Sequence, residues 1–261
     1  MTTIISVVNQ KGGVGKTTTS VNVASALAKL GFRVLIIDFD PQGHSGEHLG
    51  VHAENGKSAL EVLEKEKSLI SCIYASKVRN LWILPANLKL GQFNQNSPVG
   101  RQFSLKEAVE SDLLDSDKFD FVIIDCQPSL SLLTLNALVT CDCVLLPVQA
   151  EFLALDGLSQ LIVTLKEIKT KLHPKLSVLG ILLTMYDRRN KLSYEVKSEL
   201  EKNFRKDLFE TVIPRSVKLA EAPSFGQSIL DYAPDSPGSI AYKELATEII
   251  NKLDIKIKKQ K

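Results

Sequence analysis

The sequence predicts one α/β domain, built as a doubly wound, mostly parallel sheet with helices on both faces. Short runs rich in Val, Ile and Leu alternate with longer helical patterns, and three of these runs end in an aspartate or a glycine-rich turn. Near-continuous apolar runs are typical of strands that are buried on both faces. The alternation of strands and helices is typical of a doubly wound α/β sheet.

The expected elements follow one another along the chain. Strands are expected at residues 4–8, 34–37, 81–84, 121–124, 144–148 and 178–183. Helices are expected at residues 17–30, 155–171 and 192–204. We found no internal repeat, linker or break in composition, so residues 1–261 are expected to form a single domain. Roughly the last eight residues should form a flexible basic tail, because their apolar residues alternate with period two and include no aromatic anchor.

Composition narrows the class of protein. The formal net charge is +2, so any binding of nucleic acid must depend on local clusters of basic residues. Four scattered cysteines do not form a disulfide framework, which favours a reducing compartment. The apolar N-terminal run is too short for a signal peptide, and no run approaches the roughly 18 residues of a membrane span. We therefore expect a cytoplasmic protein.

A glycine-rich loop follows the first expected strand. Gly15-Lys16-Thr17 matches the end of the Gly-x4-Gly-Lys-[Ser/Thr] motif, and the loop as a whole comprises Lys11, Gly12, Gly13, Val14, Gly15, Lys16, Thr17 and Thr18. In such loops backbone N–H groups surround phosphates, the lysine neutralises β- and γ-phosphate charge, and the hydroxyl binds Mg²⁺. The sequence therefore predicts ATP and Mg²⁺ as ligands. Two departures are visible: Gln10 replaces the first glycine, and Lys11 is an additional lysine.

Carboxylates follow two further strands. Asp38 ends the second strand, Asp40 lies in the loop beyond it, and Asp125 ends the strand at 121–124. Carboxylates close to a triphosphate repel it unless Mg²⁺ or a water molecule lies between them. Because ligands bind at the carboxyl ends of strands in such sheets, we expect the three side chains near the glycine loop.

The loop Lys-Gly-Gly-x-Gly-Lys-Thr resembles the deviant Walker A loop of the ParA/MinD ATPases. Over nearly its whole length, the chain resembles the ParA/Soj partitioning branch of this family most. The segments that carry this resemblance are residues 9–20, 40–43, 149–158, 183–187, 213–215 and 221–223. The resemblance implies that Lys11 reaches the ATP of a partner subunit in a homodimer. It also implies roles for Lys11, Lys16 and Asp40 in catalysis, with Asp40 positioning the attacking water. Thr17, Asp38 and Asp125 would hold Mg²⁺, the carboxylates through water, and Pro214 and Ser216 would contact adenine.

The same resemblance implies a DNA-partitioning switch. The ATP-bound dimer would bind DNA non-specifically and associate with the nucleoid, through Arg188, Arg189, Arg215 and Lys218. A ParB-type centromere-binding protein would stimulate slow hydrolysis. The helix at 192–206 also carries lysines, but glutamates alternate with them, which favours a salt-bridged, solvated face.

Several alternatives remain open. A MinD-type membrane-associated ATPase is the second hypothesis, although the tail favours no membrane binding. Cys126 leaves open a metal-cluster carrier, although a buried apolar role fits it better. His44, His48 and His52 recur every four residues, but Gly46 and Gly50 favour a mobile loop over a helical metal site. Gln127 replaces a proline usual in the family, and either loosens its loop or adds a hydrogen bond.

Overall fold

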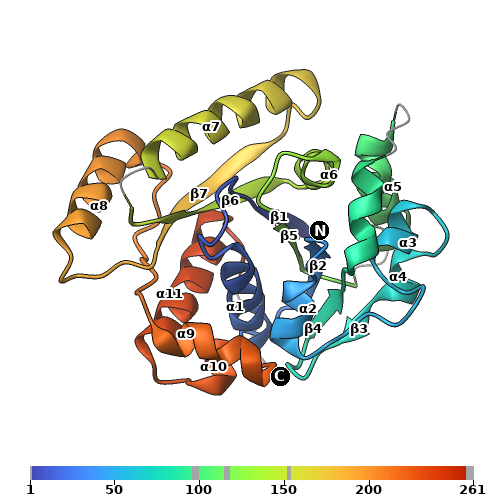
Figure 1. Cartoon of the computed structure of the whole chain (residues 1–261), viewed down its shortest axis with the longest axis horizontal. Coiled ribbons are helices and arrows are strands. Elements are labelled where there is room, and N and C mark those ends of the chain that lie inside the picture. The colour runs from blue at the N-terminus through green and yellow to red at the C-terminus, as the bar shows by residue number, and fades with distance from the viewer. Residues whose placement is uncertain (1, 96–99, 115–117, 152–153, 257–261) are drawn as a thin grey trace.

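The computed structural model describes residues 2–95, 100–114, 118–151 and 154–256. Within these ranges a seven-stranded sheet crosses the molecule in the order β3-β4-β2-β5-β1-β6-β7 (Figure 1). All neighbouring strands are parallel except β3 and β4. The strands are β1 (Thr3–Val7), β2 (Val34–Phe39), β3 (Tyr74–Ala75), β4 (Leu81–Leu84), β5 (Phe121–Cys126), β6 (Cys143–Gln149) and β7 (Ser177–Thr184).

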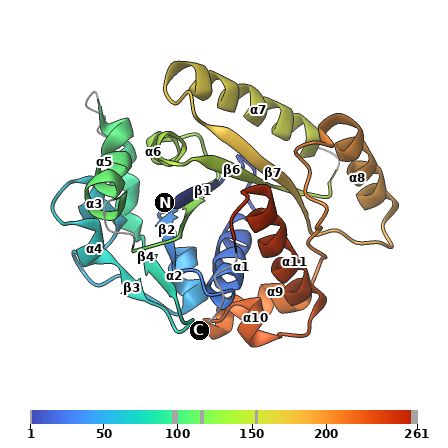
Figure 2. The ribbon, with the colours of Figure 1, turned by 180° about the vertical axis from the view of Figure 1, so that it is seen from behind.

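Helices cover both faces of this sheet (Figures 1 and 2). The longer ones are α1 (Lys16–Lys29), α6 (Leu132–Thr140), α7 (Ala154–Lys171), α8 (Lys191–Phe204) and α11 (Pro237–Lys252). The shorter ones are α2 (His44–Leu49), α3 (Ala59–Leu63), α4 (Leu69–Cys72), α5 (Ser104–Val109), α9 (Val217–Glu221) and α10 (Ile229–Tyr232). Short 3₁₀ or π turns lie at Leu88–Asn94 (η1), Arg101–Phe103 (η2), Glu110–Leu114 (η3) and Ala222–Phe225 (η4).

Two apolar layers form because successive strand side chains point to opposite faces. On β2, Leu35 and Ile37 belong to the apolar layer that includes buried residues of α3, α5, α6 and α7. Val34 and Ile36 belong to the layer that includes α1, α10 and α11. Nearly every residue of β2, β5 and β6 is buried, as the near-continuous apolar runs predict. The predicted doubly wound sheet is thus confirmed.

The three strand ends that carry the polar residues lie level with one another. In the parallel register, Val7 of β1 and Asp38 of β2 both pair with Asp125 of β5. The glycine loop leaves β1 at this edge and enters α1. The sheet therefore brings the loop and the aspartates to one place, as expected for the carboxyl edge of a doubly wound sheet.

The predicted strands and long helices are found with small shifts at their ends. Strand β3 was not predicted, because two residues carry no periodic pattern. The sequence also gave no sign that β3 would run antiparallel at the sheet edge. All four cysteines are buried and unpaired with one another.

The prediction of a mobile loop at His44–His52 was wrong for its first part, because residues 44–49 form α2. Gly43 and Gly50 adopt left-handed conformations at its ends, and Asp38 accepts hydrogen bonds from the backbone of Ser45 and Gly46. A Cβ at Gly46 would lie 2.6 Å from the carbonyl oxygen of Val51, so glycine is needed there for close packing. The three histidines do not share a face: His48 is buried, whereas His44 and His52 are exposed.

The described part of the chain contains no helix long and apolar enough to cross a membrane. The closing helix α11 ends at Lys252, and residues 253–256 follow it without further regular structure. The rest of the predicted basic tail, residues 257–261, lies outside the described residues.

Candidate nucleotide site

The glycine loop presents open backbone. Gly13 and Gly15 have φ values of 74° and 88°, a conformation that glycine adopts without steric cost. A Cβ built at Gly12, Gly13 or Gly15 would meet no atom within 4 Å, so the space beside the loop is free. The loop can therefore admit a phosphate group close to its N–H groups.

Lys16, the first residue of α1, points its ammonium group back across this loop. Its Nζ donates to the carbonyl oxygen of Lys11 at 3.0 Å, and the residue is 7% exposed. Burial lowers the pKa of Lys16, while the nearby charge of Asp125 acts in the opposite direction. The chain thus holds a largely buried positive charge against the loop, where a phosphate would supply a counter-charge.

Asp125 lies beside the start of α1. Ser20 Oγ donates to its Oδ1 at 2.9 Å and Ser45 Oγ donates to its Oδ2 at 2.8 Å, and the Thr17 hydroxyl is a third donor. Burial raises the pKa of Asp125, and these three hydrogen bonds oppose the rise. Thr17 and Asp125, both predicted at the metal, are therefore brought together. A hydroxyl and a carboxylate are oxygen ligands of the kind that Mg²⁺ prefers.

Asp38 stabilises the segment that follows β2. Its Oδ1 accepts from the backbone N–H of Asp40 at 3.2 Å, and its Oδ2 accepts from Ser45 and Gly46 at 3.0 and 3.3 Å. Burial, with a contribution from Asp125, raises the pKa of Asp38 well above its usual range. Asp38 thus fixes α2 beside Asp125; a role in the metal shell stays a prediction. Asp40 lies at the start of the turn, half-buried, and accepts from the N–H of Gln42 at 3.0 Å.

These residues fit a magnesium-bound nucleotide. An open glycine loop, a buried ammonium group and a carboxylate with adjacent hydroxyls are the groups that hold phosphates and their metal in P-loop proteins. The sequence missed Ser20 and Ser45. Ser20 lies four residues after Lys16 on α1, and this helical spacing was the available signal.

The side chain of Lys11 forms an exposed ion pair in the single chain. Its Nζ lies 2.5 Å from Glu151 Oε2, and its backbone N–H donates to Asn9 Oδ1 at 2.9 Å. The side chains of Lys11 and Glu151 are 42% and 47% exposed. Gln149 donates to the other oxygen of Glu151 at 2.6 Å. Lys11 is thus a cation at the surface, accessible to a second molecule.

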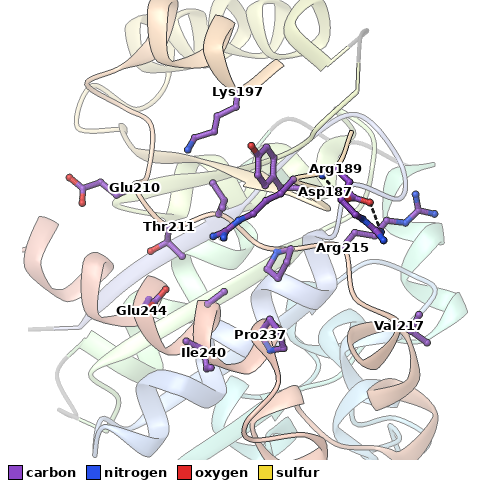
Figure 3. A pocket seen from close by; sticks show the side chains of 15 residues that line it. Asp187, Arg189, Lys197, Glu210, Thr211, Arg215, Val217, Pro237, Ile240 and Glu244 are labelled. Atoms are coloured by element: carbon purple, nitrogen blue, oxygen red, sulfur yellow. Dashed lines mark hydrogen bonds and ion pairs between the residues drawn. The ribbon is translucent and has the colours of Figure 1, made fainter. Parts of the chain in front are cut away.

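Three of the four predicted basic residues line a groove of about 820 Å³, called the basic groove below (Figure 3). Arg188, Arg189 and Arg215 line it, together with Pro214. Lys197 and three carboxylates also line it: Asp187, Glu210 and Glu244. Arg189 forms a two-pronged ion pair with Asp187, at 3.1 and 3.0 Å. This pair lowers the pKa of Asp187 to about 2.

Lys218 lies outside this groove, on α9. It pairs with Glu221 at 3.0 Å and lies 5.5 Å from the ring centre of Tyr232. On α8 the lysines pair with glutamates of the same helix, as the sequence predicted for a solvated face. Ser216 precedes α9 as its cap residue, near Pro214, so the suggested adenine contacts lie beside the basic groove.

Gln127 forms a hydrogen bond from its side-chain amide to the hydroxyl of Ser131. Of the two interpretations of this substitution, the structure shows the added hydrogen bond. Cys126 is buried, and burial raises the pKa of its thiol well above the usual range. Among the described residues, no group of three or more His, Cys, Asp or Glu side chains is placed to hold a metal ion.

Comparisons with known proteins agree with this geometry. The AAA domain family model matches residues 2–178. The chain is 44% identical over 249 residues to the sporulation initiation inhibitor protein Soj of Bacillus subtilis, covering 94% of this chain and 97% of that protein. It is 46% identical over 246 residues to the chromosome-partitioning ATPase Soj of Thermus thermophilus, covering 94% of each.

A solved structure also matches nearly the whole chain. It is described as cobyrinic acid a,c-diamide synthase from Mycobacterium smegmatis with bound ATP analogue and magnesium. The TM-score is 0.83 and the identity is 34%, covering 97% of this chain and 96% of that one. The family model covers more than half of the chain, and the Soj proteins match almost all of it. The chain therefore belongs to the Soj/ParA family of chromosome-partitioning ATPases.

Proposed function

We propose that this chain is an ATP-dependent DNA-partitioning switch. Binding of Mg²⁺ and ATP would close two chains face to face, and the dimer would bind DNA without sequence preference. Slow hydrolysis, stimulated by a ParB-type protein, would release it. The observation that carries the proposal is that Lys16, Thr17 and Asp125 lie together beside an open glycine loop. The Soj relatives are more similar in sequence than the diamide synthase, at 44 and 46% against 34% identity.

Nucleotide binding follows from the charges of the site. Lys16 would exchange its carbonyl partner on Lys11 for phosphate oxygens, which gives its buried charge a stronger partner. The N-terminus of α1 begins at the loop and adds its positive end. Bound Mg²⁺ would neutralise phosphate charge, and Thr17 and Asp125 would hold it, Asp125 through water.

Hydrolysis in this site would depend mainly on positioning and charge neutralisation. Asp40 lies in the turn that Asp38 stabilises, so its carboxylate is held near the loop and can orient a water molecule. Lys16, and Lys11 from the partner subunit, would stabilise the negative charge of the reacting phosphate. Lys11 is suited to this because its exposed ion pair with Glu151 costs little to break.

DNA binding would use the basic groove. Arg188 and Arg215 are exposed there, and Arg189 is exposed beside them. Lys218 would extend this surface on α9. A net charge of +2 is too small to attract DNA by itself, so the affinity would come from this local cluster and would fall steeply with salt.

The test is co-sedimentation of the purified chain with DNA and, separately, with anionic liposomes, each with ATP and with ADP. A partitioning switch should be retained on DNA with ATP and released by ADP or by added salt. It should ignore liposomes. Binding to liposomes that requires residues 250–261 would support a MinD-type function instead. A chain that ignores ATP, and stays monomeric when hydrolysis is blocked, would rule out both functions.

A further inference from the structure

Thr184 reaches from the end of β7 to the glycine loop. Its hydroxyl donates to the carbonyl oxygen of Val14 at 2.8 Å, although the two residues are 170 positions apart. They are 2% and 1% exposed, so water does not compete for this hydrogen bond. The glycine-loop motif does not include Thr184, and the family resemblance over 183–187 implied no role for it.

This hydrogen bond fixes the direction of one peptide group. The C=O of Val14 and the N–H of Gly15 belong to the same planar trans unit, so they point in opposite directions. Thr184 holds the carbonyl toward the protein interior, which turns the Gly15 N–H toward the open side of the loop. Gly15, on one side of this unit, has a positive φ and no Cβ to restrain the rotation of the unit. The hydrogen bond from Thr184 restrains this rotation from outside the loop.

Thr184 also directly precedes the turn whose arginines line the basic groove. The next residue, Met185, has a φ of 52°, a left-handed conformation that is costly for a residue other than glycine. Both sides of Met185 are held: Ala150 donates to the carbonyl of Thr184 at 3.1 Å, and Tyr186 exchanges backbone hydrogen bonds with Ile213 and Arg215, each at 3.0 Å. Such a conformation persists only where its surroundings enforce it.

We propose that Thr184 is a positioning residue, which orients the Gly15 N–H toward the phosphates and ties the loop to the basic turn at 185–189. A phosphate bound by the Gly15 N–H would strengthen the hydrogen bond from Thr184 to the Val14 carbonyl, because that N–H and that carbonyl belong to one peptide unit. That anchor would in turn hold Met185 in its left-handed conformation and keep the arginines of the turn in place. The link to DNA rests on the proposed function, whereas the effect on nucleotide binding does not.

The test uses Thr184→Val and Thr184→Ser, which remove and keep the hydroxyl. The matched control is Thr140→Val, because the Thr140 hydroxyl is also buried and also donates to a backbone carbonyl, that of Asn136 at 2.7 Å. Binding of a non-hydrolysable ATP analogue is measured by calorimetry, and melting of the nucleotide-free chain by a thermal scan. DNA retention is then compared with and without saturating analogue.

Thr184→Val should bind the analogue roughly 5- to 10-fold more weakly than the wild type, as expected for one lost buried hydrogen bond. Thr184→Ser and Thr140→Val should bind it like the wild type. The ratio of DNA retention with and without analogue should fall severalfold in the valine variant. Thr184→Ala, which places no methyl group against the Val14 carbonyl, carries the same expectations if the valine variant does not fold.

A purely structural contact would behave differently: the nucleotide-free chain would melt earlier while the analogue bound normally, and this result would overturn the proposal. If the valine variant showed the wild-type ratio of DNA retention with and without analogue, the proposed connection between Thr184 and the turn at 185–189 would be overturned. If the wild-type chain binds the analogue but never binds DNA, the proposed function fails at the DNA step, while the calorimetric comparison still decides the role of Thr184 at the loop.

Discussion

Ser45 donates its hydroxyl hydrogen to Asp125 Oδ2 at 2.8 Å and its backbone N–H to Asp38 Oδ2 at 3.0 Å. It therefore connects the carboxylates at the ends of β2 and β5 through the first turn of α2. Because both aspartates are fully buried, each of these hydrogen bonds replaces water that the carboxylates lose on folding. A change in the hydrogen bonds of Asp125 should be transmitted to α2 through this residue.

Ser45→Ala should weaken magnesium-dependent nucleotide binding about tenfold, because Asp125 loses one of its three hydroxyl donors. Loss of a donor destabilises the carboxylate and raises the pKa of Asp125 further, so the weakening should be larger at pH 6 than at pH 8. Magnesium titrations at fixed nucleotide and at both pH values measure this. Ser25→Ala is the control, since the buried Ser25 hydroxyl has no hydrogen-bond partner among the described residues. Equal magnesium affinity of Ser45→Ala and wild type at both pH values would contradict this role.

Asp40→Ala should slow ATP turnover by about a hundredfold while leaving nucleotide binding intact, if Asp40 orients the attacking water. On that basis the Asp40→Ala variant should accumulate as ATP-bound dimers on DNA.

Lys16→Ala should instead lose nucleotide binding or dimerisation, because it removes the buried cation at the loop. Phosphate release and size-exclusion chromatography with ATP separate the two effects. An Asp40→Ala chain that hydrolyses ATP faster than wild type would refute the assignment.

His48 should make the chain less stable in mild acid. Burial lowers its pKa to about 4, its ring donates a hydrogen bond to the Gln227 carbonyl, and its Nε2 has no partner. A depressed pKa means that the unfolded chain binds the proton more readily between the unfolded value of about 6.5 and the folded value. The stability is therefore present above about pH 6.5 and is lost as the pH falls toward 4.

His48→Asn should flatten this dependence, since the amide keeps a donor and does not titrate. Urea unfolding at several pH values from 4.5 to 7.5 measures the slope. His44→Asn, on the same helix but exposed, should keep the wild-type slope. The same slope in His48→Asn and wild type would show that another group is responsible.

The sequence predicted the features that depend on local pattern. Buried parallel strands and the glycine loop have characteristic composition and spacing, and the position of Asp125 after β5 followed from the strand itself. The contacts that hold the site together were not predictable, because Ser45 and Thr184 act on residues 80 and 170 positions away. Helix α2 was missed for a related reason: its glycines disfavour a helix locally, and a distant carboxylate, Asp38, stabilises its first turn.

Asp187→Asn should strengthen DNA retention about two- to threefold at low salt. Asp187 pairs with Arg189 through two hydrogen bonds, so the aspartate occupies the guanidinium that would contact phosphate. Removing its charge leaves one more cation for DNA, and the salt slope should become steeper by about one. Retention on DNA over a range of salt concentrations measures both effects. Glu199→Gln on α8 should change neither, and an unchanged slope in Asp187→Asn would place Arg189 outside the DNA contact.

Gly226→Ala should destabilise the chain more than alanine at another glycine with a similar backbone. Gly226 has a φ of 62°, and a Cβ there would lie 3.1 Å from the Cα of Gly50, so the backbone after α2 would have to move away. Gly56 has a φ of 74°, but its Cβ would approach only the flexible end of Lys67, at 3.6 Å. Left-handed strain of about 1–2 kcal/mol is common to both substitutions, and close packing adds about 1–3 kcal/mol at Gly226 alone. Urea unfolding of both variants measures the difference. Equal losses of stability in the two variants would mean that α2 and Gly226 can move apart at no cost. A larger loss in Gly226→Ala would show that the contact between Gly50 and Gly226 holds α2 against the segment after η4.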